Sequence, residues 1–139
     1  MKTKITQLSA SETWILRHNV MWPTKPLDYV KLPKDLEGTH FGLWKDEILV
    51  SVVSLFIEDG SAQFRKLATE TDKQGNGYGT ALLSYVMQYA SDQKVSKIWC
   101  NARTDKTSFY KKFGMIETDR RFTKGNQDYV IMEKVIWKG

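Results

Sequence analysis

The sequence has little of several features that mark particular classes of protein. Cys100 is its only cysteine, so no internal disulfide can form, which disfavours a disulfide-stabilised secreted fold. No apolar run approaches the ~20 residues that a membrane-spanning helix needs. The basic segment 1–7 is followed only by short apolar stretches broken by charged residues, unlike a signal peptide. We therefore expect a cytoplasmic protein with no membrane association.

What the sequence does have is the composition of an ordinary globular protein. Its 139 residues are 41% hydrophobic and 27% charged, and they show no repeat or low-complexity linker, so we expect a single domain over residues 1–139. The net charge of +5 suits polyanionic ligands, whether a phosphorylated cofactor or a nucleic acid. Because the basic residues are spread along the chain and are not grouped with aromatics, we expect no nucleic-acid partner.

The succession of hydrophobic patterns predicts an α/β (α+β) domain in which helices flank a mixed, mostly antiparallel sheet. Ser9 and Glu12 form a capping-box pattern at the start of a helix that should end before Pro23. The segment 22–36 should be irregular, with a helical turn near 27–30. Strands are expected over residues 2–8, 40–44, 48–57, 62–69, 95–101 and 129–136, the second to fourth of them forming a meander. Two further helices are expected, from Gly79 to about residue 91 and over residues 104–112 before Gly114.

A glycine-rich turn lies between the meander and the long helix. It reads Gln74-Gly75-Asn76-Gly77-Tyr78-Gly79-Thr80. The first N–H groups of a helix lack intrahelical partners and lie at the positive end of its dipole, so phosphate binds well there, and glycine lets the backbone come close. The turn has neither the Gly-Lys-Ser/Thr ending of a Walker A loop nor the spacing of a dinucleotide fingerprint. An ordinary turn closing onto a helix is the alternative.

Two linked motifs carry a resemblance to a known family. The pattern Q-x-x-G-x-G, on Gln74, Gly77 and Gly79, resembles the coenzyme A-binding signature of the GCN5-related N-acetyltransferase (GNAT) superfamily. A second family element, a strand followed by a short helix carrying Phe-Tyr and then a glycine, resembles residues 98–103 followed by Phe109-Tyr110 and Gly114. The motifs occur in the family's order and separation, and the resemblance covers about residues 38–136.

The resemblance implies an N-acetyltransferase that moves an acetyl group from acetyl-CoA to a primary amine by direct attack in a ternary complex, without a metal. It implies that backbone groups of Leu67 and Ala68 hold the pantetheine arm. Asn101 is similar to a cofactor-side asparagine of many relatives, although it could instead cap the following turn. The pyrophosphate would be held by a set of turn residues: Gln74, Gly75, Gly77, Tyr78, Gly79 and Thr80.

Gln74 stands where many relatives carry arginine, which leaves two readings open. A neutral amide supplies hydrogen bonds but no charge, so Gln74 could be a direct ligand or a solvated turn residue. Lys73 or another basic residue could then supply the positive charge.

For catalysis, the resemblance points to Tyr110 as the acid that protonates the leaving thiolate. A phenol with a pKa of ~10 stays protonated at neutral pH and can donate to an emerging thiolate. The alternative is a helix residue whose ring merely packs. We expect Cys100 to be a buried strand residue and His18 a surface residue. No general base is assigned among four candidates: His40, Glu58, Asp59 and Glu70.

The acceptor stays open between a small-molecule amine and a protein amine, and a homodimer is compatible with the sequence. Five aromatics of the N-terminal half could line the acceptor pocket, although we expect most of them in the core: Trp14, Trp22, Tyr29, Phe41 and Trp44. The alternative function is a non-catalytic coenzyme A-binding sensor or scaffold module. Retention of Tyr110 and of the glycines argues against that alternative.

Overall fold

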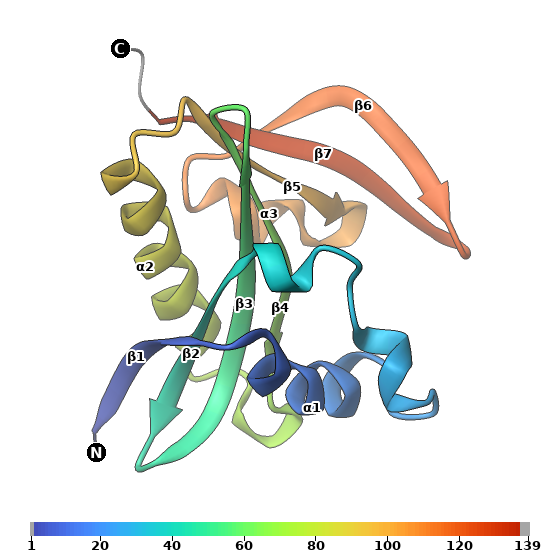
Figure 1. Cartoon of the computed structure of the whole chain (residues 1–139). Helices are drawn as coiled ribbons and strands as arrows, with labels where there is room; N and C mark the ends of the chain where they lie inside the picture. The colour runs from blue at the N-terminus through green and yellow to red at the C-terminus, as the bar shows by residue number, and fades with distance from the viewer. Residues whose placement is uncertain (1, 137–139) are drawn as a thin grey trace. The chain divides into compact units, whose positions relative to one another are not determined.

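The computed structural model describes residues 2–136, and Figure 1 shows its elements in chain order. The strands are β1 (Thr3–Leu8), β2 (Thr39–Lys45), β3 (Ile48–Glu58), β4 (Ser61–Thr69), β5 (Lys97–Arg103), β6 (Ile116–Lys124) and β7 (Gln127–Val135). The α-helices are α1 (Ala10–Met21), α2 (Tyr78–Asp92) and α3 (Thr107–Lys111), and the 3₁₀ turns are η1 (Leu27–Val30), η2 (Asp35–Glu37), η3 (Thr71–Lys73) and η4 (Thr104–Lys106).

The strand order in the sheet is β1-β2-β3-β4-β5-β7-β6. The β4–β5 pair is parallel, whereas β1–β2, β2–β3, β5–β7 and β6–β7 are antiparallel. The predicted mixed, mostly antiparallel sheet with helices is therefore confirmed. Within residues 2–136, no helix is long and apolar enough to cross a membrane.

The described residues group into two compact units, which we call the N-terminal unit (residues 2–56 and 66–87) and the C-terminal unit (residues 57–65 and 88–136).

The core of the N-terminal unit lies on both faces of β3. Val52 packs with Leu8 and Leu16, the latter from α1, and successive side chains of a strand alternate, so Val53 points to the opposite face. There Phe41, the register partner of Val53, contacts Tyr85 of α2 with ring centroids 5.7 Å apart. Burial on both faces explains why β3 is apolar from Ile48 to Ile57 except at the buried serines Ser51 and Ser54, with no alternation of polar and apolar residues.

The start of α1 is as predicted, but the aromatics around it differ from the expectation. The capping box forms, and the Glu12 carboxylate accepts the Ser9 N–H at 2.8 Å. Phe41 is buried, yet Trp22 and Tyr29 are 38% and 53% exposed and pack edge to face with centroids 5.1 Å apart. The expectation that most of the N-terminal aromatics lie in the core is therefore wrong for this pair, because Trp22 caps the C-terminus of α1 and Tyr29 lies in the short turn η1.

In the C-terminal unit, β5 is paired on one side with β4 and on the other with β7. Ile98, Cys100 and Ala102 of β5 are buried, whereas Asn101 and Arg103 are exposed, as alternation requires. The expected helix over residues 104–112 is divided into η4 and α3, and Gly114 follows it at a φ of 86°. Strand β5 begins two residues later than expected.

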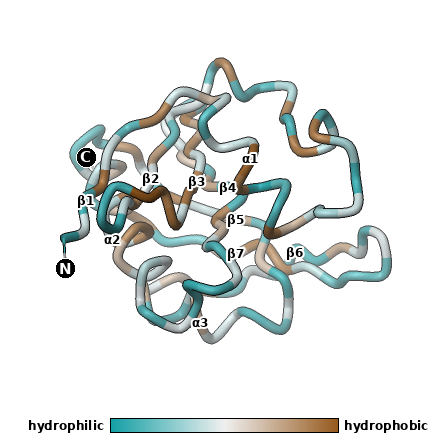
Figure 2. The backbone as a smooth tube through the Cα atoms, turned by 90° about the horizontal axis from the view of Figure 1, so that it is seen from below, coloured by the Kyte–Doolittle hydropathy of each residue, from teal (hydrophilic) through white to brown (hydrophobic). Residues whose placement is uncertain are grey.

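Strand β6 was not predicted. Its sequence, Ile116-Glu-Thr-Asp-Arg-Arg-Phe-Thr-Lys124, is mostly polar and charged, because β6 pairs only with β7 and little of it is buried. Figure 2 shows the β6–β7 turn as largely hydrophilic. The turn residues Gly125 and Asn126 both have positive φ, as in a two-residue hairpin. Gly-Asn was therefore the available signal.

Because the core lies on both faces of β3, shortening a buried leucine and shortening an exposed one should affect stability very differently. Leu82 on α2 is 0% exposed, whereas Leu36 in η2 is 90% exposed. We expect Leu82→Ala to lower the free energy of unfolding by about 2–5 kcal/mol, because it leaves a cavity in close-packed surroundings. The matched control Leu36→Ala should change it by less than about 0.5 kcal/mol. Urea denaturation measures both, and equal effects would contradict the packing described here.

Candidate functional site

The glycine-rich turn joins η3 to α2 through two glycines in the left-handed region. Gly75 and Gly77 have φ of 82° and 80°, a conformation that glycine adopts without steric cost. No other atom lies within 4 Å of the point where a Cβ would sit on either residue. The backbone of the turn is therefore open to close approach by a ligand.

The N–H groups at the start of α2 are unpaired. The first hydrogen bond into the helix runs from the Ala81 N–H to the Gly77 carbonyl oxygen at 3.0 Å. In the part of the chain that the structure describes, the N–H groups of residues 77–80 have no hydrogen-bond acceptor. They lie at the positive end of the helix dipole, so the arrangement can hold an anion.

Two side-chain amides hold the turn in this conformation. Gln74 donates its Nε2–H to the Thr69 carbonyl oxygen at 3.1 Å, and Asn76 donates its Nδ2–H to the Lys73 carbonyl oxygen at 2.9 Å. Since the amide of Gln74 is bonded to the end of β4, the geometry favours a structural role in the turn for this residue.

A second lysine lies near the turn and was missed from the sequence. The Nζ of Lys45, at the end of β2, lies 5.9 Å from the ring centroid of Tyr78, the first residue of α2. Strands β3 and β4 separate Lys45 from the turn in the sequence, so no local sequence pattern could connect the two. Its charge adds to that of Lys73 on the N-terminal side of α2.

At the end of β4, the backbone N–H and C=O groups of successive residues point alternately toward β3 and away from it. Glu70 donates its N–H to the Val50 carbonyl oxygen of β3 at 2.8 Å, and backbone groups alternate between the two edges of a strand, so those of Ala68 also face β3. The Ala68 carbonyl oxygen accepts the Ser51 hydroxyl as well, at 3.1 Å. The backbone of Leu67 faces the opposite edge, directly after Lys66, whose φ of 59° marks a local irregularity in the strand. Of the two residues predicted to bind pantetheine, Leu67 has the better-placed groups.

Asn101 and Tyr110 belong to the C-terminal unit. The β4–β5 pairing covers only Ser61–Gln63 with Lys97–Trp99, whereas β5 continues to Arg103 and pairs with β7 throughout. Asn101 therefore lies where β5 has no β4 partner in this unit, and it is exposed. Tyr110 on α3 is half-buried, with its ring 5.7 Å from that of Phe64.

Burial is the main cause of the pKa shifts of Tyr110 and Cys100 in this unit. It raises the pKa of Tyr110 well above the ordinary value for a phenol, and Cys100 adds to the rise while the Arg103 charge opposes it. Burial also raises the pKa of the Cys100 thiol to about 12. Tyr110 thus stays protonated at neutral pH and can donate a hydrogen bond. Cys100 is the buried strand residue that the sequence predicts.

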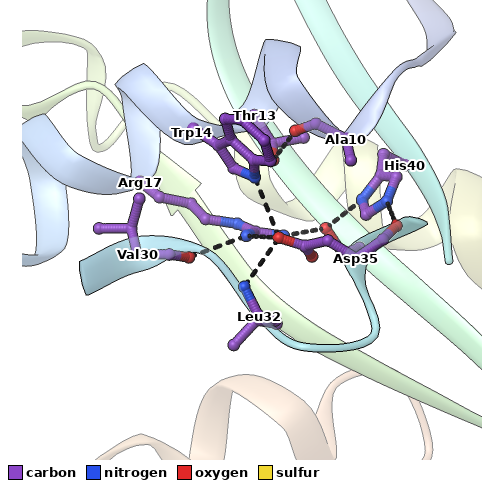
Figure 3. A network of polar contacts seen from close by, with 9 residues as sticks. Ala10, Thr13, Trp14, Arg17, Val30, Leu32, Asp35 and His40 are labelled. Atoms are coloured by element: carbon purple, nitrogen blue, oxygen red, sulfur yellow. Dashed lines mark hydrogen bonds and ion pairs between the residues drawn. The ribbon is translucent and has the colours of Figure 1, made fainter. Parts of the chain in front are cut away.

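His40, one of the four base candidates, is committed to a buried network (Figure 3). It is 2% exposed, with Nδ1 lying 2.7 Å from the Ser54 hydroxyl and Nε2 lying 2.7 Å from the Asp35 carbonyl oxygen. The Asp35 carbonyl oxygen can only accept, so Nε2 carries the proton that His40 donates to it, and Ser54 also accepts an N–H of Arg17. With both ring nitrogens engaged and its side chain buried, His40 cannot contact an acceptor amine.

The same network contains an ion pair between Arg17 of α1 and Asp35. The guanidinium donates to the two carboxylate oxygens at 2.8 and 3.0 Å, and Asp35 also accepts the Trp14 Nε1–H and the Leu32 N–H (Figure 3). Burial alone would raise the pKa of Asp35, but these hydrogen bonds and the Arg17 charge hold it below its ordinary value. Through Arg17, the network binds residues 30–35 to α1.

His18 and Asp59 are two further candidates from the sequence. His18 is half-buried, and its Nε2 lies 2.5 Å from the Lys25 carbonyl oxygen, so it helps to hold the loop after α1. Asp59 lies in the β3–β4 turn with a positive φ. Among residues 2–136, no group of three or more His, Cys, Asp or Glu side chains is arranged to hold a metal ion.

Comparisons with known proteins agree on one family. A profile of the Acetyltransferase (GNAT) domain matches residues 25–136. The uncharacterised N-acetyltransferase YitI of Bacillus subtilis is 25% identical over 143 residues, covering 96% of each chain. A solved structure from Lactobacillus plantarum has a TM-score of 0.87 at 19% identity, covering 98% of this chain and 99% of that one. A GNAT family acetyltransferase from Elizabethkingia anophelis, solved with acetyl-CoA bound, has a TM-score of 0.75 at 16% identity, covering 96% and 97%. At such identities, the structural likeness concerns the fold.

The buried ion pair predicts a large effect of removing one charge. We expect Asp35→Asn to lower the free energy of unfolding by roughly 3–5 kcal/mol, because it leaves the Arg17 guanidinium buried without its counter-charge. The matched control is Asp28→Asn, which breaks an exposed pair with Lys31 and should leave the denaturation midpoint unchanged. Chemical denaturation measures both. A wild-type midpoint for Asp35→Asn would show that the network contributes no stability.

Proposed function

Because this chain belongs to the GNAT superfamily of N-acetyltransferases, we propose that it moves the acetyl group of acetyl-CoA to the primary amine of an acceptor by direct attack in a ternary complex. The observation that carries this proposal is the set of unpaired N–H groups at residues 77–80, beside the open backbone of Gly75 and Gly77. A diphosphate offers the acceptor oxygens that such amides lack. The relative from Elizabethkingia anophelis that holds acetyl-CoA supports the same cosubstrate.

The residues present fit the parts of coenzyme A. The pyrophosphate binds the backbone N–H groups of five residues: Gly75, Gly77, Tyr78, Gly79 and Thr80. The Thr80 hydroxyl is a further donor, and Lys45 and Lys73 add positive charge. The pantetheine amides pair with the backbone of Leu67 as an added strand would. Gln74 holds the turn in shape, and Asn101 is an exposed amide of β5 that can hydrogen-bond the cofactor.

In the reaction, a neutral amine nitrogen attacks the thioester carbon, a C–N bond forms and the C–S bond breaks. The nitrogen loses one proton and the sulfur gains one, so the products are an amide and a free thiol. The ordinary pKa of a thiol is ~8.5 and that of a phenol ~10, and burial raises the latter further at Tyr110. Complete transfer of the phenolic proton to the thiolate is therefore uphill, and Tyr110 acts mainly as a hydrogen-bond donor that stabilises the departing sulfur.

The phosphate role of the turn predicts the effect of one added carboxylate. Acetyl-CoA should raise the melting temperature of the wild type, as any ligand selective for the folded state does. Gly77→Asp should abolish this rise, because its carboxylate would repel the diphosphate. Gly60→Asp is a matched control, since Gly60 has a φ of 77° and equally open surroundings in another turn. If Gly77→Asp kept the wild-type shift, the turn would not be the phosphate site.

The proposed role of Tyr110 predicts a separation of turnover from binding. Tyr110→Phe should lower kcat by roughly 10- to 100-fold, as expected for loss of a hydrogen bond to a charged group worth about 1.5–3 kcal/mol. The KM for acetyl-CoA should stay near the wild-type value. Tyr85→Phe is the control and should leave both constants unchanged, since Tyr85 is partly exposed on α2 and the substitution keeps the ring that packs against Phe41.

The pH dependence of kcat provides the second readout for Tyr110. Because its pKa is raised, the phenol keeps its proton beyond pH ~10, so Tyr110 should cause no loss of rate below that value. An alkaline limb below pH ~10 that disappears in Tyr110→Phe would remove this residue from the proposed role.

A further inference from the structure

The β5–β7–β6 sheet has one face that α3 does not cover. Helix α3 lies on the other face, where Lys111 of α3 and Arg121 of β6 both pair with Glu117, at 2.8 and 3.0 Å. Arg120 instead approaches Glu133, at 3.8 Å, on the face away from α3. We call this the open face.

An aromatic row crosses the open face. The registers align Arg103 of β5 with Tyr129 of β7, and Tyr129 with Phe122 of β6, so these three side chains lie side by side on one face. The rings of Phe122 and Tyr129 are stacked, with centroids 5.0 Å apart and planes 13° from parallel. Phe122 is 39% exposed although it is a large apolar residue.

The charge of the open face is positive. Lys97 and Arg120 share a single carboxylate, that of Glu133, at 3.6 and 3.8 Å. Arg103 lies 3.5 Å from Asp105, and both side chains are more than half exposed, so the pair is weak and Arg103 can exchange Asp105 for a carboxylate of a partner. Lys124, two residues after Phe122 on β6, adds a further basic side chain to the open face.

We propose that the open face docks an acidic segment of a polypeptide acceptor, beside the amine that the acceptor presents for acetylation. This inference rests on the proposed function, because Asn101 lies on the same face as Arg103 and next to the stretch of β5 that lacks a β4 partner. Carboxylates of the segment pair with Arg103, Arg120 and Lys97, and its apolar side chains pack on the aromatic row.

The extent and the geometry of the open face favour a polypeptide. Lys97 and Arg103 lie six residues apart on one strand, roughly 20 Å at about 3.3 Å per residue, which is longer than a single amino acid. Single-stranded nucleic acid needs free aromatic faces on which its bases can stack. Phe122 and Tyr129 stack on each other and so cover one face of each ring.

The test is direct binding of an acidic peptide, without cofactor. The probe is an extended peptide rich in Asp and Glu, with a free N-terminus and a C-terminal fluorophore, measured by fluorescence anisotropy at low and at physiological ionic strength. The test variant is Arg103→Glu with Arg120→Glu, whose side chains are 52% and 59% exposed. The control is Lys111→Glu with Arg121→Glu, whose side chains are 54% and 57% exposed on the α3 face. The two variants change the same charge at equal exposure.

We expect the test variant to bind the peptide about tenfold more weakly than wild type, and the control to stay within about twofold. Equal weakening in both variants, no measurable binding to wild type, or equal binding of a basic peptide or an oligothymidylate would overturn the proposal. The acetyl-CoA-induced rise in melting temperature is measured on the same samples. If it persists while the peptide fails to bind, the open-face proposal fails alone, and if it is absent, the proposed function fails separately.

Discussion

The four unpaired N–H groups at the start of α2 are the constraint on which the account of this protein depends. A backbone N–H that has no hydrogen-bond acceptor is unfavourable, and in this turn only solvent or a bound anion can supply the acceptor. The left-handed φ angles of Gly75 and Gly77 let the chain enter the helix without closing over these donors. A side chain at either glycine would cost backbone strain and would stand where a ligand approaches. The local geometry of the turn and its capacity to hold an anion thus have the same cause.

The buried network of the N-terminal unit has a different physical basis. Two opposite charges, a serine and a histidine are removed from water, which is costly unless hydrogen bonds compensate. Asp35 receives such bonds from a guanidinium, an indole and a backbone N–H. Among the buried side-chain nitrogen and oxygen atoms of residues 2–136, the Nε of Arg17 is the one without a hydrogen-bond partner. The network fixes an irregular, proline-containing segment that has little apolar core of its own.

Much of the fold was predictable because its signals are local. The meander, the amphipathic α2 and the 3₁₀ turn at Leu27–Val30 follow from periodicity, turn residues and prolines. Strand β6 was missed because an edge strand needs no apolar face, and charged residues are the usual protection of such an edge. The positive φ of Lys66 has no sequence signal, since nothing in a lysine predicts a left-handed backbone.

In the candidate site too, residues within local motifs were found from the sequence and residues brought together by folding were not. The turn and Tyr110 were found from sequence, because each lies in a compact motif, and their roles stay predictions. Lys45 and the Arg17–Asp35 pair were missed, because residues far apart in the chain meet only in the folded unit. A charged residue on a helix ordinarily indicates a solvated face, and Arg17 departs from that rule because a partner carboxylate is buried with it.

The most direct test of the central claim is a titration with coenzyme A followed by the backbone amide resonances of the protein. The amide signals of Gly77, Tyr78, Gly79 and Thr80 should shift most and saturate together, since each N–H gains a charged acceptor. If these four signals stayed in place while the saturating shifts clustered elsewhere in the chain, the turn would not be the diphosphate site.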